Sequence, residues 1–292
     1  MSSGRAWRFQ LLVALAMVAW GGSWVSAKWA SGYEPLLTVF WRFLFTTISF
    51  VPILLWRREP LWPSRRAWGW IALSAVFFAL YNFCFLWGLR SGGGGYGGVL
   101  VPTLNPVFTF LLTLAFLREP LGRAQVLGLC IGLSGGILQV LGPDLDWHAV
   151  LHPENLFFLA AAASYAALTH TGAAAQRDSS VFTYSFWLFL VSTLLIFPFA
   201  LPHAPFDTAG LGGPFWANAA YLALGAGTFG TTLYFEAARR VGAARASSFA
   251  FLVPVSALLL AFFFLGEEPS WTSVVGGALS IAAVLLVQLR RG

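Results

Sequence analysis

Long apolar runs separated by short polar connections make up almost the whole chain. A helix that crosses a lipid bilayer needs about 20 mostly apolar residues. Runs of about this length cover residues 7–29, 35–56, 67–89, 95–117, 123–141, 154–175, 181–201, 215–239, 244–265 and 271–289. The longest connections, 142–153 and 202–214, are too short for a soluble module. The pattern therefore predicts an all-α polytopic membrane protein with ten transmembrane helices.

Composition argues against a soluble protein. Of the 292 residues, 58% are hydrophobic and only 10% are charged, whereas soluble domains usually contain about 25% charged residues. The formal net charge is +6. In a soluble protein such an excess suggests nucleic-acid binding, but in a membrane protein it more often reflects basic loops on the cytoplasmic side. We therefore expect the lipid bilayer, and no nucleic acid, as a partner.

The basic residues also predict how the helices are oriented. With the N-terminus in the cytoplasm, fourteen arginines fall on the cytoplasmic side, while Lys28 and Arg90 fall outside. This bias follows the positive-inside rule and predicts that both termini lie in the cytoplasm. We expect the membrane to be a bacterial inner membrane. The start of the chain also looks like a signal peptide, because Arg5 and Arg8 are followed by apolar residues and then by Val25-Ser26-Ala27 as a possible cleavage site. We expect this run to be retained, because an internal repeat includes it.

The two halves of the chain match one another. Residues 105–120 align with residues 253–268 at an offset of 148 residues, and Gly128 then falls on Gly276. Each half carries five predicted spans, and since five is odd, the second half enters the membrane with the opposite orientation. Inverted repeats are typical of secondary transporters, whose substrate sites lie near the bilayer midplane between the halves. We expect two inverted five-helix repeats, residues 1–146 and 147–292, within one membrane domain.

A series of short motifs resembles the EamA-type branch of the drug/metabolite transporter superfamily over the whole chain. The motifs are Trp20-Gly21-Gly22-Ser23, Lys28, Pro35, Arg42-Phe43, Tyr81-Asn82-Phe83, Gly88-Leu89-Arg90, Pro106, Glu119, Gln125 and Gly128. The aromatic-rich spans are further similar to bacterial aromatic amino acid exporters. The resemblance implies export of small metabolites, with amino acids including aromatic ones as the first expectation and proton-coupled efflux of flat toxic cations as the alternative. The glycine-rich segment 91–98 departs from the family pattern, and we expect it to be unusually flexible.

Aromatic and polar side chains within the spans are the candidate substrate-binding residues, because polar groups are costly in a membrane. Spacings of three and four place them on shared helix faces. They are Trp20, Ser23 and Trp24; Phe78, Tyr81, Asn82 and Phe85; Tyr165, Thr169 and His170; and Thr231 and Phe235. Together they would line a cavity that stacks a flat substrate and hydrogen-bonds its polar end. For each ring alone, core packing or an interfacial aromatic belt is the alternative.

Two ionisable residues within the spans have competing interpretations. Arg42 lies seven residues into the second span and would bind a substrate carboxylate, pair within the bundle, or extend to the outer headgroups. Glu236 precedes Arg239 and Arg240 by three and four residues, so a local salt bridge competes with a proton-carrying role.

Small residues and prolines mark where the helices approach closely or bend. Gly128, Gly132 and Gly136 recur at a spacing of four, which permits close helix contact in lipid and suggests a tight scaffold, a sliding seam between the halves, or ordinary packing. Pro106 and Pro254 interrupt the fourth and ninth spans at matching positions, where a missing amide hydrogen bond makes a hinge plausible.

Other classes of membrane protein fit the sequence less well. The four histidines lack metal-ligand spacing, and the spans hold no carboxylate pair, so a membrane protease is not expected. No segment resembles a repeated channel filter. We expect no enzyme activity, cofactor or metal, and a small-molecule substrate as the partner. The sequence leaves the oligomeric state open.

Overall fold

The computed structural model describes residues 3–29, 32–90, 97–117, 122–153 and 155–289, and every regular element among them is helical. The α-helices are α1 (Ser3–Trp29), α2 (Pro35–Arg57), α3 (Arg65–Arg90), α4 (Gly97–Leu112), α5 (Arg123–Leu141), α6 (Trp147–Leu151), α7 (Asn155–Ala175), α8 (Val181–Ala200), α9 (Gly213–Tyr221), α10 (Thr232–Val241), α11 (Ala243–Ser247), α12 (Leu252–Leu265) and α13 (Trp271–Leu289). Two π-helical segments, η1 (Thr113–Leu117) and η3 (Leu222–Thr231), and two 3-10 segments, η2 (Leu201–His203) and η4 (Ser248–Phe251), connect some of them. The segment 91–96, Arg118, Glu119 and the last three residues lie outside this description, as does the side chain of Lys28.

Local sequence signals set where these helices begin and end. Pro35 occupies the first turn of α2, where its missing amide hydrogen costs nothing. Ser180 caps α8, and its hydroxyl accepts a hydrogen bond from the Thr183 amide at 3.2 Å. At the other end of α2, Arg58 adopts a left-handed conformation (φ 54°), and its amide donates to carbonyls of the last turn.

Nine of the described helical stretches are long and apolar enough to cross a membrane. The eighth expected span, 215–239, is not among them, and it is not one continuous α-helix. The chain stays helical from α9 through α10, but the ten-residue π-helix η3 separates them. Glycine or alanine fills half of this π-helix, and its Gly227 packs against Thr46 of α2.

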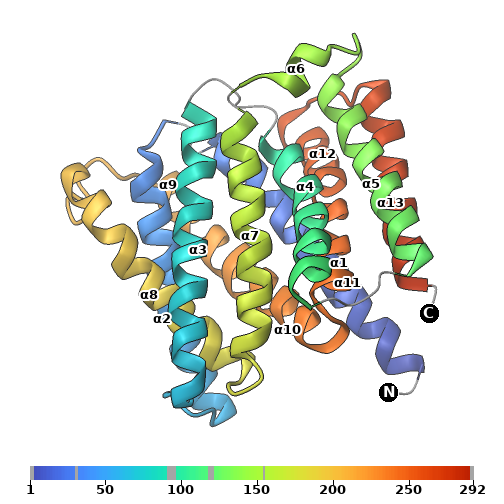
Figure 1. Ribbon diagram of the computed structural model, residues 1–292. Coiled ribbons are helices and arrows are strands. Elements are labelled where there is room, and N and C mark those ends of the chain that lie inside the picture. The colour runs from blue at the N-terminus through green and yellow to red at the C-terminus, as the bar shows by residue number, and fades with distance from the viewer. Residues whose placement is uncertain (1–2, 30–31, 91–96, 118–121, 154, 290–292) are drawn as a thin grey trace.

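Helices from the two halves of the sequence pack directly against each other. Extensive contacts join α2 to α8 and α5 to α13, and α1 and α2 both contact η3. Figure 1 shows α5 and α13 side by side at one edge of the bundle, and α1 begins at the end of the bundle where α13 ends. The short helix α6 lies at the opposite end of the bundle, where it links the two halves.

Glycines bring α5 and α13 into backbone contact. A Cβ atom placed on Gly135 would lie 2.6 Å from the carbonyl oxygen of Gly276, and one placed on Gly276 would lie 2.5 Å from the carbonyl oxygen of Gly135. Gly128 also faces α13, at Val287, so Gly128 and Gly135 lie on the face of α5 that packs against α13.

The other two glycines of the predicted stripe face different partners. Gly132 meets the ring of Phe251 in η4, and Gly136 meets Thr103 of α4. Pro106 lies inside α4 and is buried, and Pro254 lies in the first turn of α12, directly after η4. The prolines and glycines therefore gather where α4, α5, η4 and α12 adjoin.

Candidate functional site

The ring of Tyr165, on α7, is the centre of an aromatic cluster drawn from four helical segments. Its centroid lies 5.6 Å from that of Trp20 on α1, 5.0 Å from that of Tyr81 on α3 and 5.9 Å from that of Tyr234 on α10. Phe78 of α3 lies 6.4 Å away. The Trp20 and Tyr81 rings approach Tyr165 edge to face, a favourable arrangement for aromatic pairs. These five residues are called the Tyr165 cluster below.

A row of rings continues from this cluster along α3. The Tyr81 ring stacks between Phe78, at 6.0 Å, and Phe85, at 5.9 Å. The Phe85 ring in turn meets Trp24 of α1 at 6.4 Å and Phe158 of α7 at 6.0 Å. Phe78, Tyr81 and Phe85 thus form one aromatic face of α3, as their spacing predicts.

Exposure differs sharply between members of the Tyr165 cluster. Phe78 and Tyr234 are buried (1% and 0% exposed), and Tyr165 is nearly so at 6%. Trp20 and Tyr81 are only half-buried. The buried rings therefore fix the cluster in place, while Trp20 and Tyr81 keep part of their surface accessible for contact with another molecule.

The π-helix η3 positions Trp20. The Trp20 indole Nε1 donates to the carbonyl oxygen of Ala226 at 3.0 Å, and the Thr231 hydroxyl donates to the same oxygen at 3.1 Å. A Cβ atom on Gly230 would lie 2.7 Å from the indole Nε1, so only glycine fits there without displacement. π-Helical turns are frequent at functional sites, and this one holds the indole in a single orientation.

Most candidate hydroxyl and amide groups bond within the protein. Ser23 donates to the Ala19 carbonyl at 3.3 Å, and the Asn82 amide donates to the Phe78 carbonyl at 2.8 Å. Thr169 is fully buried, and its hydroxyl lies 3.0 Å from that of Tyr234. These groups stabilise helices and ring positions.

Two of the predicted site residues also pack against neighbouring helices. His170 faces α4, where its Nε2 lies 3.1 Å from the Thr109 carbonyl oxygen. Phe235 is fully buried, and its ring packs edge to face on Tyr184 of α8 at 5.2 Å and lies 5.8 Å from the ring of Tyr234 in the cluster. A place for either residue beside a substrate stays a prediction.

The structure adds Tyr234, which the sequence had not singled out. Its ring lies 5.0 Å from Trp20, and its hydroxyl bonds the side chains of Thr169 and Asn105. Tyr234 lies three residues after Thr231, and that helical spacing was the signal available for finding it.

Arg42, on α2, lies beside the cluster. The guanidinium lies near Tyr81 and Tyr165, and its Cζ atom lies 5.6 Å from the centroid of the Phe43 ring. Its Nε atom is buried and has no hydrogen-bond partner.

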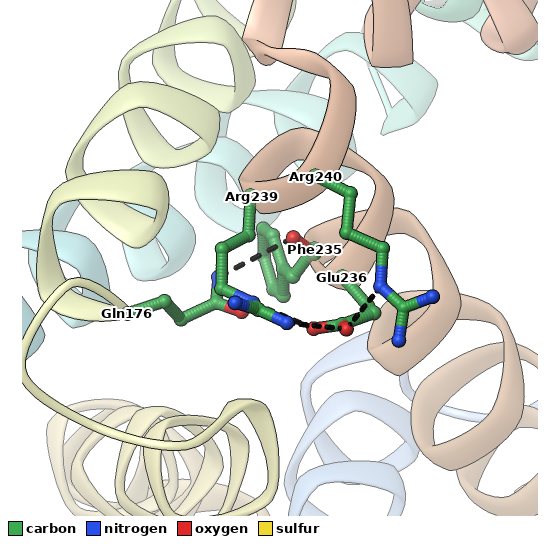
Figure 2. A network of polar contacts seen from close by, with 5 residues as sticks. All are labelled: Gln176, Phe235, Glu236, Arg239 and Arg240. Atoms are coloured by element: carbon green, nitrogen blue, oxygen red, sulfur yellow. Dashed lines mark hydrogen bonds and ion pairs between the residues drawn. The ribbon is translucent and has the colours of Figure 1, made fainter. Parts of the chain in front are cut away.

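Glu236 forms a second charged group near the end of α10 (Figure 2). Its Oε1 accepts from Arg239 Nη2 at 2.6 Å and from Arg240 Nε at 2.5 Å, and its Oε2 accepts from Arg239 Nε at 2.9 Å. The Arg240 guanidinium also covers the Phe9 ring of α1 at 4.6 Å. The predicted local salt bridge is therefore present within α10, and the contact of Arg240 with Phe9 joins α10 to α1.

Figure 2 also shows Gln176, whose side-chain amide donates to the Phe235 carbonyl at 3.4 Å. A cavity of about 290 Å³ adjoins this network. Its lining includes Glu59, Ser179, Phe182, Glu236 and Arg239. Among the described residues, no group of three or more His, Cys, Asp or Glu side chains is placed to hold a metal ion.

Comparison with known proteins places this arrangement in a family. The sequence profile of the EamA-like transporter family matches residues 7–141 and, a second time, residues 152–289. The chain belongs to the EamA-like transporter family. The double match covers nearly all of both halves, so this EamA-like chain is a polytopic membrane transporter built from two related segments.

Individual relatives agree with this assignment. A probable terminal-alkyne amino-acid exporter of Streptantibioticus cattleyicolor is 32% identical over 78% of this chain and 75% of its own length. An uncharacterized transporter of Archaeoglobus fulgidus is 24% identical over 96% of this chain and 97% of its own length. One crystal structure superimposes with a TM-score of 0.77 at 19% identity and covers 97% of this chain and 96% of that one. That likeness shows a shared fold.

Proposed function

We propose that this EamA-like transporter exports small metabolites, principally amino acids including aromatic ones, by alternating access through a central aromatic site. The observation that carries the proposal is the Tyr165 cluster, because helices from both halves supply its rings. A site shared between halves is exposed to one side and then the other when the halves rock against each other. Its flat surfaces suit an aromatic or apolar side chain.

The name of one relative supports the choice of substrate class. The Streptantibioticus cattleyicolor protein is described as a probable exporter of a terminal-alkyne amino acid. An amino acid with an apolar side chain has two charged groups at one end and an apolar surface at the other. A site with an arginine beside a group of rings matches that distribution.

The helix contacts support an inverted arrangement of residues 1–146 and 147–292. If the five spans of each half correspond in order, a two-fold axis exchanges α1 with α7, α3 with the α9–α10 span, and α4 with α12. Under this exchange the contact between α3 and α7 corresponds to the contact between α1 and η3, which is part of the α9–α10 span. The contact between α1 and α12 corresponds to the contact between α7 and α4. All four contacts are present.

The distribution of charge supports an orientation with both termini in the cytoplasm. The α2–α3, α7–α8 and α10–α11 connections lie at the end of the bundle where α1 begins, and arginines are frequent in and beside them. The connection around α6 and the one after η2 contain Asp144, Asp146 and Asp207. By the positive-inside rule, the arginine-rich end faces the cytoplasm, in our proposal that of a bacterium.

Flux measurements on purified protein in liposomes test the export proposal. A panel of labelled amino acids, aromatic and aliphatic, would be loaded inside, and efflux compared with protein-free liposomes. We expect efflux of at least one aromatic amino acid that saturates with concentration and is competed by other members of the panel. Tyr165→Ala, purified and reconstituted in the same way, is the matched control. The absence of efflux for every amino acid would contradict the proposal.

A further inference from the structure

Arg42 is a charged side chain set among aromatic groups within the bundle. Tyr81 and Tyr165 lie near its guanidinium, and its Cζ atom lies 5.6 Å from the centroid of the Phe43 ring, which stacks on Phe78 of the Tyr165 cluster at 4.9 Å. Its Nε atom is buried and makes no hydrogen bond. In the described part of the chain, the carboxylate of Glu236 pairs with Arg239 and Arg240 and not with Arg42.

An arginine in this situation calls for a ligand. Withdrawing a cation from water is costly unless acceptors replace the water, and charged residues inside membrane spans mark substrate or ion pathways. An arginine that extends to the headgroups satisfies its donors there, but the Arg42 Nε is out of contact with solvent. The residue stands seven positions after Pro35 in α2, which corresponds to about 10 Å along the helix axis.

We propose that Arg42 binds the carboxylate of the transported substrate, while the Tyr165 cluster holds the substrate's side chain. This inference rests on the proposed export of amino acids and names the group that recognises the common part of every amino acid. A planar guanidinium pairs with a carboxylate through two parallel hydrogen bonds, and Tyr81 and Tyr165 of the cluster lie near it.

The charges around Arg42 favour a monocarboxylate over other ligands. One guanidinium balances one carboxylate, whereas a phosphate group with nearly two negative charges is usually held by more than one cation. Tyr81 and Tyr165, which lie near Arg42, add no second positive charge. A cationic drug would be repelled by the positive guanidinium, while the ammonium group of an amino acid can rest on the face of an aromatic ring.

The first test changes the substrate and leaves the protein intact. Purified wild-type protein would bind the labelled aromatic amino acid that gives the highest flux in the panel, for example phenylalanine. Unlabelled phenylalanine and phenylalaninamide, which keeps the ring and the ammonium but lacks the carboxylate, would then compete for the site. We expect the amide to compete about tenfold or more weakly, since a charge-assisted hydrogen bond is lost. Equal competition would overturn the inference.

The second test changes the arginine. In Arg42→Gln we expect affinity for the acid to fall about tenfold or more while affinity for the amide stays near the wild-type value. Arg42→Lys keeps the charge and should restore part of the preference. Arg57→Gln, at the other end of α2, is the matched control and should change neither affinity. An equal loss for acid and amide in Arg42→Gln would show that the arginine only supports the fold.

The outcomes separate this inference from the export proposal. Transport of amino acids without discrimination between acid and amide would contradict the role of Arg42 alone. Wild-type protein that transports none of the panel but accumulates flat cations such as viologens would contradict both proposals. If Arg42→Gln does not purify as a folded protein, the competition between phenylalanine and phenylalaninamide on the wild-type protein still shows whether the site recognises the carboxylate.

Discussion

The rings of Trp20 and Tyr165 meet edge to face with their centroids 5.6 Å apart, at an interplanar angle of 87°. Trp20 belongs to α1 in the first half of the chain and Tyr165 to α7 in the second. The pair therefore links the halves at the centre of the Tyr165 cluster, and any motion of one half against the other must alter this contact.

Removing single rings from the cluster should weaken transport without unfolding the protein. Trp20→Ala, Tyr81→Ala and Tyr165→Ala are each expected to lower flux while expression stays near normal. Loss of a positioned aromatic partner costs about 0.5–1.5 kcal/mol beyond area burial, which corresponds to about two- to tenfold in affinity. The measurement is the concentration dependence of amino acid efflux from liposomes.

A surface tryptophan provides the control for these variants. Trp56 is 81% exposed near the end of α2, so Trp56→Ala removes an equally large ring without touching the Tyr165 cluster. We expect its flux to match wild type. Unchanged flux in all three cluster variants would show that the substrate binds elsewhere.

The contact between Gly135 and Gly276 should be essential to stability. Gly135→Ala places a Cβ atom 2.6 Å from a backbone carbonyl oxygen of α13, where no side chain can rotate away. Overpacking of this kind costs about 1–3 kcal/mol, so the midpoint of thermal unfolding in detergent should fall. Gly69→Ala is the matched control, because no atom lies within 4 Å of the new Cβ and alanine favours the helix. Equal midpoints for the two variants would contradict a rigid contact between α5 and α13.

The spans and the α3 face could be predicted from sequence because each depends on local pattern. Apolar length alone locates the membrane helices, and α-helical spacing groups Phe78, Tyr81 and Phe85 correctly. The η3 segment broke the pattern. A π turn rotates less per residue than an α turn. Thr228 and Thr231 of η3 therefore face different neighbours. The Thr228 hydroxyl contacts that of Ser49 on α2 at 2.5 Å, whereas the Thr231 hydroxyl bonds the same carbonyl oxygen as the Trp20 indole.

Long-range packing decided the features that the sequence could not specify. Gly135 and Gly276 are each one of many glycines, and only the docking of α5 on α13 distinguishes them. His170 and Phe235 have the residue types of a binding site, but the sequence alone does not reveal that they contact α4 and α8. Which neighbour covers a helix face depends on how the whole bundle assembles.

Reporter fusions should reveal the inverted arrangement. Fusions after Asp178 and after Arg291 are expected to lie in the cytoplasm, and a fusion within residues 144–152 on the opposite side, since one span separates residues 144–152 from Asp178 and four spans separate Asp178 from Arg291. The readout is paired alkaline phosphatase and fluorescent protein activity in cells. Reversal of two of the three positions would rule out the five-plus-five arrangement.

Energy coupling is the last property that the geometry addresses. Proton-driven carriers usually hold a carboxylate or histidine whose protonation favours one state. Glu236 is occupied by Arg239 and Arg240 at 2.6 Å and 2.5 Å, and protonating it would break both ion pairs and leave their charges uncompensated. His170 contacts the α4 backbone. We therefore expect facilitated transport, in which cytoplasmic accumulation of the substrate sets the direction of flow.

Liposomes with equal substrate on both sides and an imposed pH step test this expectation. A step of about two units would bias a one-proton carrier by about 2.7 kcal/mol, and we expect it to cause no net accumulation of substrate. Accumulation that a protonophore or Glu236→Gln abolishes would identify a proton-coupled carrier instead, with Glu236 as its proton site.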